Sequence, residues 1–503
     1  MRGVADELWQ DLLDAAWVVL DWEAGDVPVW TGRLEVTGDP GHLLSRLPAE
    51  DMAIACAGAA LLAAAALHAG RGGAIPRALC LDRGHVAAAF RSEAWLRVNG
   101  EPAGAGFAPL SRFWRACDGW VRTHGNYPWH RDALLRALAC DDDCEAVAAA
   151  IAGLGAHDVE DLVTGAGGVA AAVRTEAGWL GEPAAQAVAA AGLVEGCLRR
   201  FAGWDGVFSI GGAPPRRRAA GTLPASGVRV LDLTRVIAGP VATRYLAALG
   251  ADVLRLDPPD RPELPPNARD GLVGKRSSLL DLHTPAGNAR LHELLSRADV
   301  LVHGYRPGAL DRCGLAHGVL AERYPGLVVV SLSAWGSRGP WGCRRGFDSI
   351  VQAACGIAMA ESPDGDRPGA LPCQLLDHAT GYLCAAAVLR ALAAQASLGG
   401  TLFRELSLAR TALWLLTQPR NGAPARAAPS GAAPSGVALA GAALAGAAPS
   451  GAAPSSARAR WLTTLDSVEG PVTVVRPLGR LDGLELAWPS RLTQYGSDPP
   501  AFG

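Results

Sequence analysis

One carboxylate in the chain stands where it could act as a nucleophile. Asp377 follows two apolar residues, Leu375 and Leu376, and precedes an apolar run, 379–392, whose composition favours a helix. An aspartate at the start of a helix faces free backbone N–H groups, which keep it ionised and can stabilise negative charge that develops beside it. The same position is also common for an N-cap, so this residue alone does not distinguish a nucleophile from a cap.

Phosphate groups need cationic side chains, and this chain supplies them almost entirely as arginine. Of the 46 lysine and arginine residues, Lys275 is the single lysine. It lies in the stretch Gly274-Lys275-Arg276-Ser277, and its presence in an arginine-rich chain suggests a contact with phosphate. A surface position without a function is an equally good interpretation.

Cysteines and histidines give no pattern for a metal ion. The chain has 11 cysteines, and the one close pair, Cys140 and Cys144, has no further histidine or cysteine ligand nearby. We therefore expect no metal site. The odd number of cysteines, the acidic N-terminus and the lack of a signal peptide predict a cytoplasmic protein.

The elements that would position these groups are clearest in the middle of the chain. Residues 228–233 predict a short buried strand, 239–249 a helix and 251–256 a second buried strand. This is a βαβ unit, the opening of a parallel sheet of the Rossmann type, and Asp257 ends the second strand where a ribose-binding acid would lie. The turn at 234–240 lacks the sequence G-x-G-x-x-G, so an NAD-dependent oxidoreductase would lose its binding mechanism.

That turn resembles the first turn of the family III CoA-transferases, the CaiB/BaiF type. Four further blocks resemble the same family, in the same order and at plausible spacing, and together they are far more specific than any one of them. These blocks are 274–277 (GKRS), 298–315 (ADVLVHGYRPGALDRCGL), 346–353 (GFDSIVQA) and 375–383 (LLDHATGYL).

The resemblance implies an α/β fold, with a Rossmann-like, parallel-sheet CoA-binding domain and a mainly helical α+β half that is like the family's small domain. It also implies an enzyme that moves CoA between an acyl-CoA and a free carboxylic acid, with no permanently bound cofactor. Asp377 falls on the family's nucleophilic aspartate, which forms an anhydride and then an aspartyl-CoA thioester. Because members of the family are dimers, a homodimer is expected.

The resemblance also places the residues that contact CoA. Arg312 is the strongest single candidate for a phosphate or ribose contact. Asp348 would be a second carboxylate near the site, and a solvated helix start is an equally good interpretation of it. The basic residue that family members often carry after the second strand is replaced by Pro258, which leaves Arg255 or Arg261 to substitute. The positions implied for CoA binding are Ile237, Ala238, Leu280, His283, Gly304, Tyr305, Arg306, Arg312, Arg345 and Asp348.

Two other functions remain open. The family contains α-methylacyl-CoA racemases, which need a histidine directly before the aspartate of the 346–353 block. Phe347 stands there and cannot transfer a proton, which disfavours racemisation. The other alternative is a non-catalytic CoA-binding or association protein of the same fold, because the order of the family's parts differs in this chain.

The order of the regions is unusual for that family. Stretches 112–138 and 171–189 resemble the family's small domain, which here precedes the nucleotide-binding half instead of following it, as in a fusion or rearrangement of family halves. The expected regions are 1–205 as the small-domain half, 206–226 as a linker rich in Gly, Pro and Arg, 227–420 as the CoA-binding half with the catalytic aspartate, 421–460 as a disordered low-complexity tether and 461–503 as a tail that packs on the body.

Bulk properties restrict the partners. The chain of 503 residues is half apolar and carries a formal net charge of -3, which predicts no general affinity for nucleic acid. The longest apolar run, 54–67, is too short and too rich in alanine for a membrane span and predicts a buried helix. We therefore expect acyl-CoA and a small carboxylic acid as partners, and neither membrane nor nucleic acid.

Overall fold

The computed structural model describes most of the chain, with two long gaps. The expected linker at 206–226 and the expected tether at 421–460 fall almost entirely outside the described residues. The described residues are 8–21, 30–76, 78–104, 106–199, 223–422, 459–481, 484 and 486–503.

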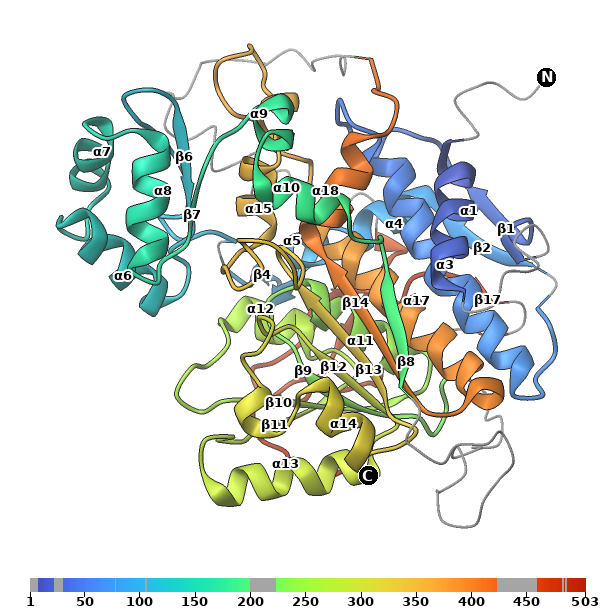
Figure 1. Cartoon of the computed structure of the whole chain (residues 1–503). Coiled ribbons are helices and arrows are strands. Elements are labelled where there is room, and N and C mark those ends of the chain that lie inside the picture. Colours follow the sequence, from blue (N-terminus) through green and yellow to red (C-terminus); the bar gives the residue numbers. More distant parts are fainter. Residues whose placement is uncertain are drawn as a thin grey trace.

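A seven-stranded sheet forms the centre of the molecule (Figure 1). Its strand order is β11-β10-β9-β12-β13-β14-β8, and all neighbours are parallel except the edge pair β14 and β8. The sheet confirms the predicted α/β class and includes the predicted βαβ unit. The strands are β8 (Glu195–Arg199), β9 (Arg229–Leu233), β10 (Asp252–Asp257), β11 (Arg276–Leu279), β12 (Val300–His303), β13 (Val328–Ser333) and β14 (Thr401–Ser407).

Alternate residues of these strands enter two different cores. Val230, Val300 and Val328 face the side covered by helices α11 (Ala238–Ala248) and α17 (Leu375–Leu398). Their neighbours Leu231, Leu301 and Val329 belong to the core under helices α13 and α14 on the other side. Apolar residues on both faces are what a parallel sheet with two helical layers requires. The covering helices of the second side are α13 (Pro285–Arg297) and α14 (His317–Arg323).

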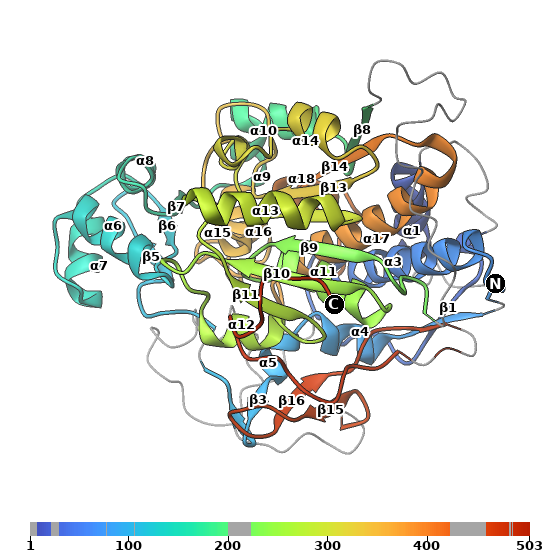
Figure 2. The same ribbon diagram turned by 90° about the horizontal axis from the view of Figure 1, so that it is seen from below.

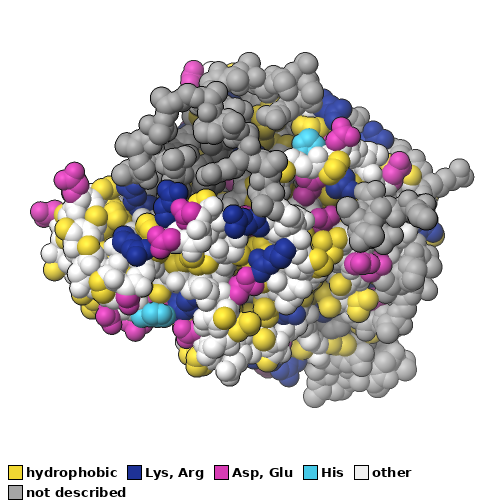
Figure 3. All heavy atoms as spheres, turned by 90° about the horizontal axis from the view of Figure 1, so that it is seen from above, with side chains coloured by type: hydrophobic (Ala, Val, Ile, Leu, Met, Phe, Trp, Pro, Cys, Tyr) yellow, Lys and Arg dark blue, Asp and Glu magenta, His cyan; other side chains and the backbone are white. Residues whose placement is uncertain are grey.

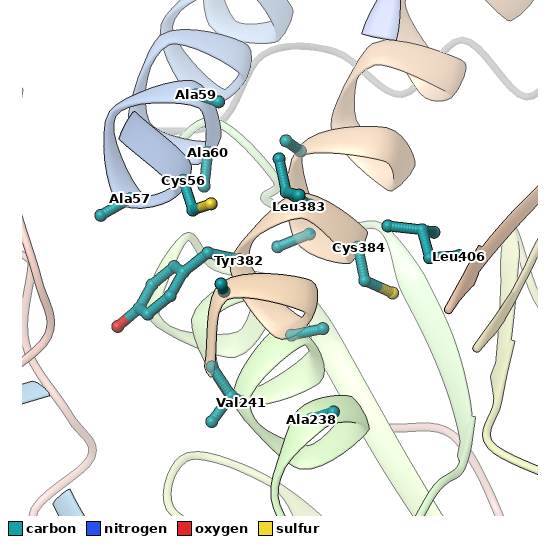
Figure 4. Close-up of a cluster of buried hydrophobic side chains, with 14 of the residues drawn as sticks. Cys56, Ala57, Ala59, Ala60, Ala238, Val241, Tyr382, Leu383, Cys384 and Leu406 are labelled. Atoms are coloured by element: carbon teal, nitrogen blue, oxygen red, sulfur yellow. The ribbon is translucent and has the colours of Figure 1, made fainter. Parts of the chain in front are cut away.

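The first hundred residues pack into this body and do not form a separate domain. Helix α3 (Ala49–Gly70) lies along α17, and α1 (Leu8–Leu20) packs on α3. By length and composition α3 could cross a membrane, yet 89% of its most apolar window is buried inside the protein, in agreement with the buried helix predicted for 54–67. Close-packed alanines dominate this contact (Figure 4).

Residues 106–173 form a distinct lobe beside the main body, at the left of Figure 1. Three short antiparallel strands and three helices enclose a small core of their own, which contains Trp114, Val121 and Ile151. The expected single region 1–205 is therefore divided between body and lobe. The lobe elements are β5 (Phe113–Arg115), β6 (Trp120–Thr123), α6 (Pro128–Leu138), α7 (Cys144–Ala152), α8 (Ala156–Gly165) and β7 (Ala170–Ala172).

The C-terminal residues return to the body and pair with the N-terminal region (Figure 2). Strand β16 pairs with β3, and β17 pairs with β2. The last residues run along β11, where Arg276 donates to the carbonyl of Ala501. The elements of these parts are β1 (Leu34–Thr37), β2 (Leu79–Asp82), α4 (Arg83–Ala89), α5 (Ser92–Trp95), β3 (Arg97–Val98), β4 (Glu101–Pro102), β15 (Leu462–Leu465), β16 (Val472–Val475) and β17 (Arg480–Leu481).

Shorter helices join the remaining parts of the body. Two of them carry the chain from the lobe back to β8, and the others flank the carboxyl ends of the sheet strands. They are α9 (Glu176–Leu180), α10 (Pro183–Ala189), α12 (Pro265–Gly271), a 3-10 turn at Asp311–Cys313, α15 (Asp348–Ala354), α16 (Ile357–Ala360) and α18 (Leu408–Leu416).

A glycine sets the spacing between α17 and α11. A Cβ atom on Gly381 would lie 2.5 Å from the carbonyl oxygen of Ala238 and 3.0 Å from the Cβ of Val241. Figure 4 shows Ala238 and Val241 on α11 directly beside α17. Because a backbone carbonyl cannot swing aside, only glycine permits this approach.

We expect Gly381→Ala to destabilise the protein by about 1 to 3 kcal/mol, since the added methyl group must push two helices apart. Thermal melting of the full chain measures the change. Gly318→Ala in α14 is the matched control, because nothing lies within 4 Å of its added Cβ; it should leave the melting temperature unchanged or raise it slightly. Equal melting temperatures for the two variants would contradict the role of Gly381.

Candidate active site

A cavity of about 500 Å³ opens at the carboxyl ends of the parallel strands, between the body and the lobe. Crevices at this end of a parallel sheet are where such folds bind ligands. Asp377 lies in its wall, and so do Tyr127, Trp129 and His130 of the lobe. The cavity therefore combines the candidate nucleophile with side chains that lie far away in the sequence.

Asp377 is the third residue of α17, and its side chain is only 6% exposed. Its backbone N–H donates to Oδ2 of Asp348 at 3.0 Å. The other carboxylate oxygen of Asp348 accepts a hydrogen bond from Gln352, one turn later on α15. Asp348, on α15, thus fixes the first turn of α17 through a backbone hydrogen bond and leaves the carboxylate of Asp377 next to the cavity.

Burial makes both carboxyl groups costly to ionise, and the charge of Asp348 adds to that cost at Asp377. Burial, followed by the charges of Asp348 and Glu93, raises the pKa of Asp377 well above its ordinary value. Burial also raises the pKa of Asp348 to about 6. In the free protein the pair therefore holds a proton at pH values where exposed aspartates are ionised, and a positively charged or polar ligand would favour its release.

A histidine next to Asp377 links this turn to the N-terminal region. His378 is fully buried, and its Nε2 lies 3.1 Å from Oε2 of Glu93 on α5. Burial alone would raise the pKa of Glu93, but the charge and hydrogen bond of His378 outweigh it and lower that pKa. Beside Glu93, Ser92 donates to Asp270 at 2.8 Å, and Asp270 pairs with Arg244 of α11 at 2.6 Å. The start of α17 is thereby tied to α5, α11 and α12.

The opposite part of the cavity is cationic. Arg261, Arg306, Arg312 and Arg345 all line it. Burial, followed by repulsion from Arg306 and Arg261, lowers the pKa of Arg345, so these arginines lie close enough to repel one another, although Arg261 also pairs with Asp260 at 3.8 Å. Guanidinium groups gathered in this way suit a ligand with several phosphates.

Aromatic and ionic contacts fasten the lobe to the body around the cavity. The ring of His124 stacks on Phe347 with centroids 3.8 Å apart. The guanidinium of Arg235 lies 5.1 Å from the ring centre of Tyr127, whose hydroxyl donates to Glu263. Further along the rim, Arg344 of the body pairs with Glu160 of the lobe, with N and O 2.8 Å apart, and Arg261 lies over the ring of Trp129.

The structure brings together most of the positions implied for CoA binding. Eight of the ten line the same cavity as Asp377, namely Ala238, Leu280, His283, Gly304, Tyr305, Arg306, Arg312 and Arg345. Arg312, the strongest single candidate, lies beside His283, with Nη2 and Nε2 3.3 Å apart. Their contact with CoA itself stays a prediction.

Two implied positions do not line the cavity. Ile237 is the residue before α11 and packs against the core between α11 and the sheet. Asp348 is 1% exposed and uses both carboxylate oxygens inside the protein. Neither the CoA contact nor the solvated helix start expected for Asp348 fits this arrangement, because its oxygens are already occupied by Asp377 and Gln352.

Lys275 is neither a phosphate contact nor a surface residue, because its ammonium group is buried inside the protein. It donates to Asp232 at 3.0 Å and to Thr243 at 2.6 Å. Arg255 is equally unsuitable as the basic residue after the second strand, since it is fully buried between Asp257 and Glu263. Arg261, at the cavity, is the one that remains. No cluster of three or more metal-ligating side chains occurs among the described residues.

The sequence alone did not single out the lobe side chains Tyr127, Trp129 and His130, nor Glu93. The first three lie in the 112–138 stretch, whose likeness to a small domain was the available signal. For Glu93 there was no signal, because a lone glutamate in a short helix has no spacing that relates it to His378.

Comparison with known proteins agrees with this geometry. Residues 225–447 match the model of CoA-transferase family III. A probable fatty acyl-CoA transferase from Mycobacterium tuberculosis is 36% identical over 34% of this chain and 46% of its own length. A succinyl-CoA:glutarate CoA-transferase from Mus musculus is 32% identical over 44% of this chain and 52% of its own length.

Solved structures match over a similar share. A CaiB/BaiF family protein from Brucella suis is 26% identical, with a TM-score of 0.36, over 39% of this chain and 56% of that chain. The chain spans about half or less of the length of the curated relatives it matches. The residues matched by the family model, 225–447, include the parallel strands β9 to β14 and Asp377.

We expect Arg345→Gln to weaken binding of free CoA about tenfold, or about 1.4 kcal/mol, because a partly buried guanidinium would no longer face the phosphates. Isothermal titration calorimetry with CoA measures the change, which should shrink as salt is raised. Arg115→Gln is the control, since Arg115 is an exposed lobe residue paired with Asp366. Equal affinity of the Arg345 variant and wild type would contradict a phosphate site here.

Proposed function

We propose that this chain transfers CoA from an acyl-CoA to a free carboxylic acid, because residues 225–447 match the model of CoA-transferase family III. One observation carries the proposal: Asp377, at the start of a long buried helix, shares a single cavity with a group of arginines suited to phosphates. The curated relatives named as CoA-transferases support the reaction class.

We propose that Asp377 is the nucleophile. Its carboxylate oxygen attacks the thioester carbonyl of the acyl-CoA, and the CoA thiolate leaves, which gives a mixed anhydride. The thiolate then attacks the aspartyl carbonyl, so that the first carboxylic acid departs and an aspartyl-CoA thioester remains. The second acid repeats the two steps in reverse and leaves as a new acyl-CoA, which regenerates the carboxylate of Asp377.

The first turn of α17 is suited to this chemistry. The positive end of the helix dipole lies beside Asp377 and favours negative charge that develops there, although the backbone N–H groups of Leu375, Asp377 and His378 are already bonded to Cys373, Asp348 and Gln374. Asp348 keeps the turn in place through the N–H of Asp377, and Glu93 does so through His378. Because Asp377 itself is buried in the cavity wall, an anhydride formed on it would be shielded from part of the surrounding water while CoA is held by the arginines.

Racemisation is less compatible with this site. The residue directly before Asp348 is Phe347, whose ring is stacked on His124 and carries no proton to exchange. A non-catalytic CoA-binding protein would have no need for a carboxyl beside the cavity that burial keeps at a raised pKa. A cytoplasmic location is part of the proposal, and free thiols on all the described cysteines support a reducing compartment.

We expect Asp377→Asn to lower the transfer rate on the order of a thousandfold or more, because the amide cannot form the anhydride. Transfer from succinyl-CoA and from acetyl-CoA to glutarate and to oxalate would be followed by chromatography of the CoA esters. The affinity for free CoA should stay close to that of wild type. Asp366→Asn, at an exposed carboxylate on a loop, is the control.

A chemical trap tests the same step without substitution. Hydroxylamine added during turnover should leave a hydroxamate on Asp377, which peptide mass spectrometry detects, and the trap should fail without acyl-CoA. Full activity of the Asp377 variant, or a hydroxamate on another residue, would refute the assignment.

We expect the transfer rate of the wild type to fall as pH is lowered through the raised pKa of Asp377, because the protonated carboxyl is not a nucleophile. Asp348→Asn removes a neighbouring negative charge and so lowers the pKa of Asp377. The acid side of the pH profile of kcat/KM should therefore move to lower pH in this variant. An unchanged profile, or a shift to higher pH, would show that the two carboxyls are not coupled in the reaction.

A further inference from the structure

Two parts of this chain repeat one structural unit. In the first part, strand β1 leads through the long buried helix α3 to the parallel strand β2 and the short helix α4. In the second part, strand β13 leads through the two short helices α15 and α16, which the first part lacks among the described residues, and then through α17 to the parallel strand β14 and the short helix α18. The helices α3 and α17 are 22 and 24 residues long and both are buried.

The junction from strand to short helix is the same in both units. Asp82 ends β2 and caps α4, accepting from the N–H of His85 at 3.0 Å. Ser407 ends β14 and caps α18, accepting from the N–H of Arg410 at 3.2 Å. In each unit the capping residue also lies directly opposite the last residue of the preceding strand, Thr37 in one and Ser333 in the other.

Each unit completes its sheet with an antiparallel strand from the other part of the chain. Strand β17, near the C-terminus, pairs with β2 of the first unit. Strand β8, which follows the lobe, pairs with β14 of the second unit. The two three-strand arrangements, β1-β2-β17 and β13-β14-β8, therefore have the same order and the same directions, with their third strands exchanged.

The two equivalent helices meet each other at the centre of the molecule. Figure 4 shows Cys56, Ala57 and Ala60 of α3 beside Leu383 and Tyr382 of α17. When the same element of two like units forms the contact, the interface has the character of a two-fold dimer interface, here within one chain.

Only the second unit carries the cavity. Within the described part of the chain, the first unit has no counterparts of β9, β10, β11 and β12, whose carboxyl ends supply most of the cavity wall. Asp51 is the third residue of α3, as Asp377 is of α17. Next to it, Glu50 accepts from the backbone N–H groups of Gly41, His42 and Leu43 and pairs with Arg83, which is a structural task.

We infer that this chain is an internal duplication, a dimer-like pair of units joined in one polypeptide, with a single working site. Among the described residues the first unit has no counterparts of β9 to β12, but it includes the lobe, which supplies Tyr127, Trp129 and His130 to the site of the second unit. This pairing takes the place of the homodimer expected from the family resemblance, because the lobe and the cavity meet within one chain.

The described surface agrees with a chain that needs no second copy. Stable obligate dimers bury a large, continuous apolar face. The large apolar side chains that are exposed here lie on separate elements, and charged side chains of both signs are interspersed on the face in Figure 3. The exposed large apolar residues are Val18, Leu44, Ile75, Leu162, Leu180, Leu279 and Val468.

Native mass spectrometry of the purified full chain, alone and titrated with CoA, tests the inference. We expect a species of one chain, 51.8 kDa, that binds one CoA. A two-chain species as the main form, or two CoA molecules on one chain, would overturn it. A single chain that binds no CoA would support the duplication and contradict the proposed function instead, so the two failures are distinguishable.

A pair of matched substitutions tests whether one site works. Asp51→Asn should keep the transfer rate within about twofold of wild type, whereas Asp377→Asn should lose it, although both change the third residue of an equivalent helix. Thermal melting of both variants shows whether the fold is kept. Loss of transfer in a folded Asp51→Asn variant would show that the first unit carries chemistry and would overturn the single-site assignment.

Discussion

The close contact of α17 with α3 and α11 is the constraint on which the site depends. Alanines along α3 and α17, and Gly381 facing the carbonyl of Ala238, let three helices approach with little side chain between them. Such packing leaves α17 no freedom to slide or rotate, because any shift brings backbone into contact with backbone. Asp377 lies in the first turn of this helix, so its position at the cavity is determined by helix packing far from the cavity.

The charged side chains at the site repel one another in the free protein, and this repulsion favours the binding of a ligand of opposite charge. Asp377 and Asp348 are both buried, and the arginines at the cavity repel one another strongly enough to lower the pKa of Arg345. Both arrangements are unfavourable in the free protein, since desolvated like charges repel. A ligand that carries phosphates and presents a carbonyl to Asp377 would relieve the cationic part, so part of its binding energy is already stored in the site.

The parts of the fold that follow from local sequence were predictable, and those that depend on distant contacts were not. Runs of apolar residues predict the βαβ unit, and a carboxylate directly before such a run predicts the helix start at Asp377. By contrast, nothing near Lys275 reveals that it will be buried against Asp232, because the partner lies on another strand. Glu93 and His378, or His124 and Phe347, are pairs that only the folded chain brings together. The repeated unit was hidden as well, since in alanine-rich helices like α3 and α17 identity in sequence carries little information.

Joining two units in one chain changes what each can do. In two separate copies, every contact between lobe and nucleotide-binding half would depend on protein concentration, whereas here both are parts of one chain and meet at all concentrations. The His124–Phe347 stack and the Arg344–Glu160 ion pair are then contacts within one molecule, and the site cannot be lost by dilution. Because the lobe of the first unit lines the cavity of the second, the described first unit contributes to the site without a cavity of this kind of its own. In the first unit, Asp51 stands where Asp377 stands in the second, and its neighbour Glu50 has a structural role: it accepts hydrogen bonds from the backbone N–H groups of the loop at 41–43.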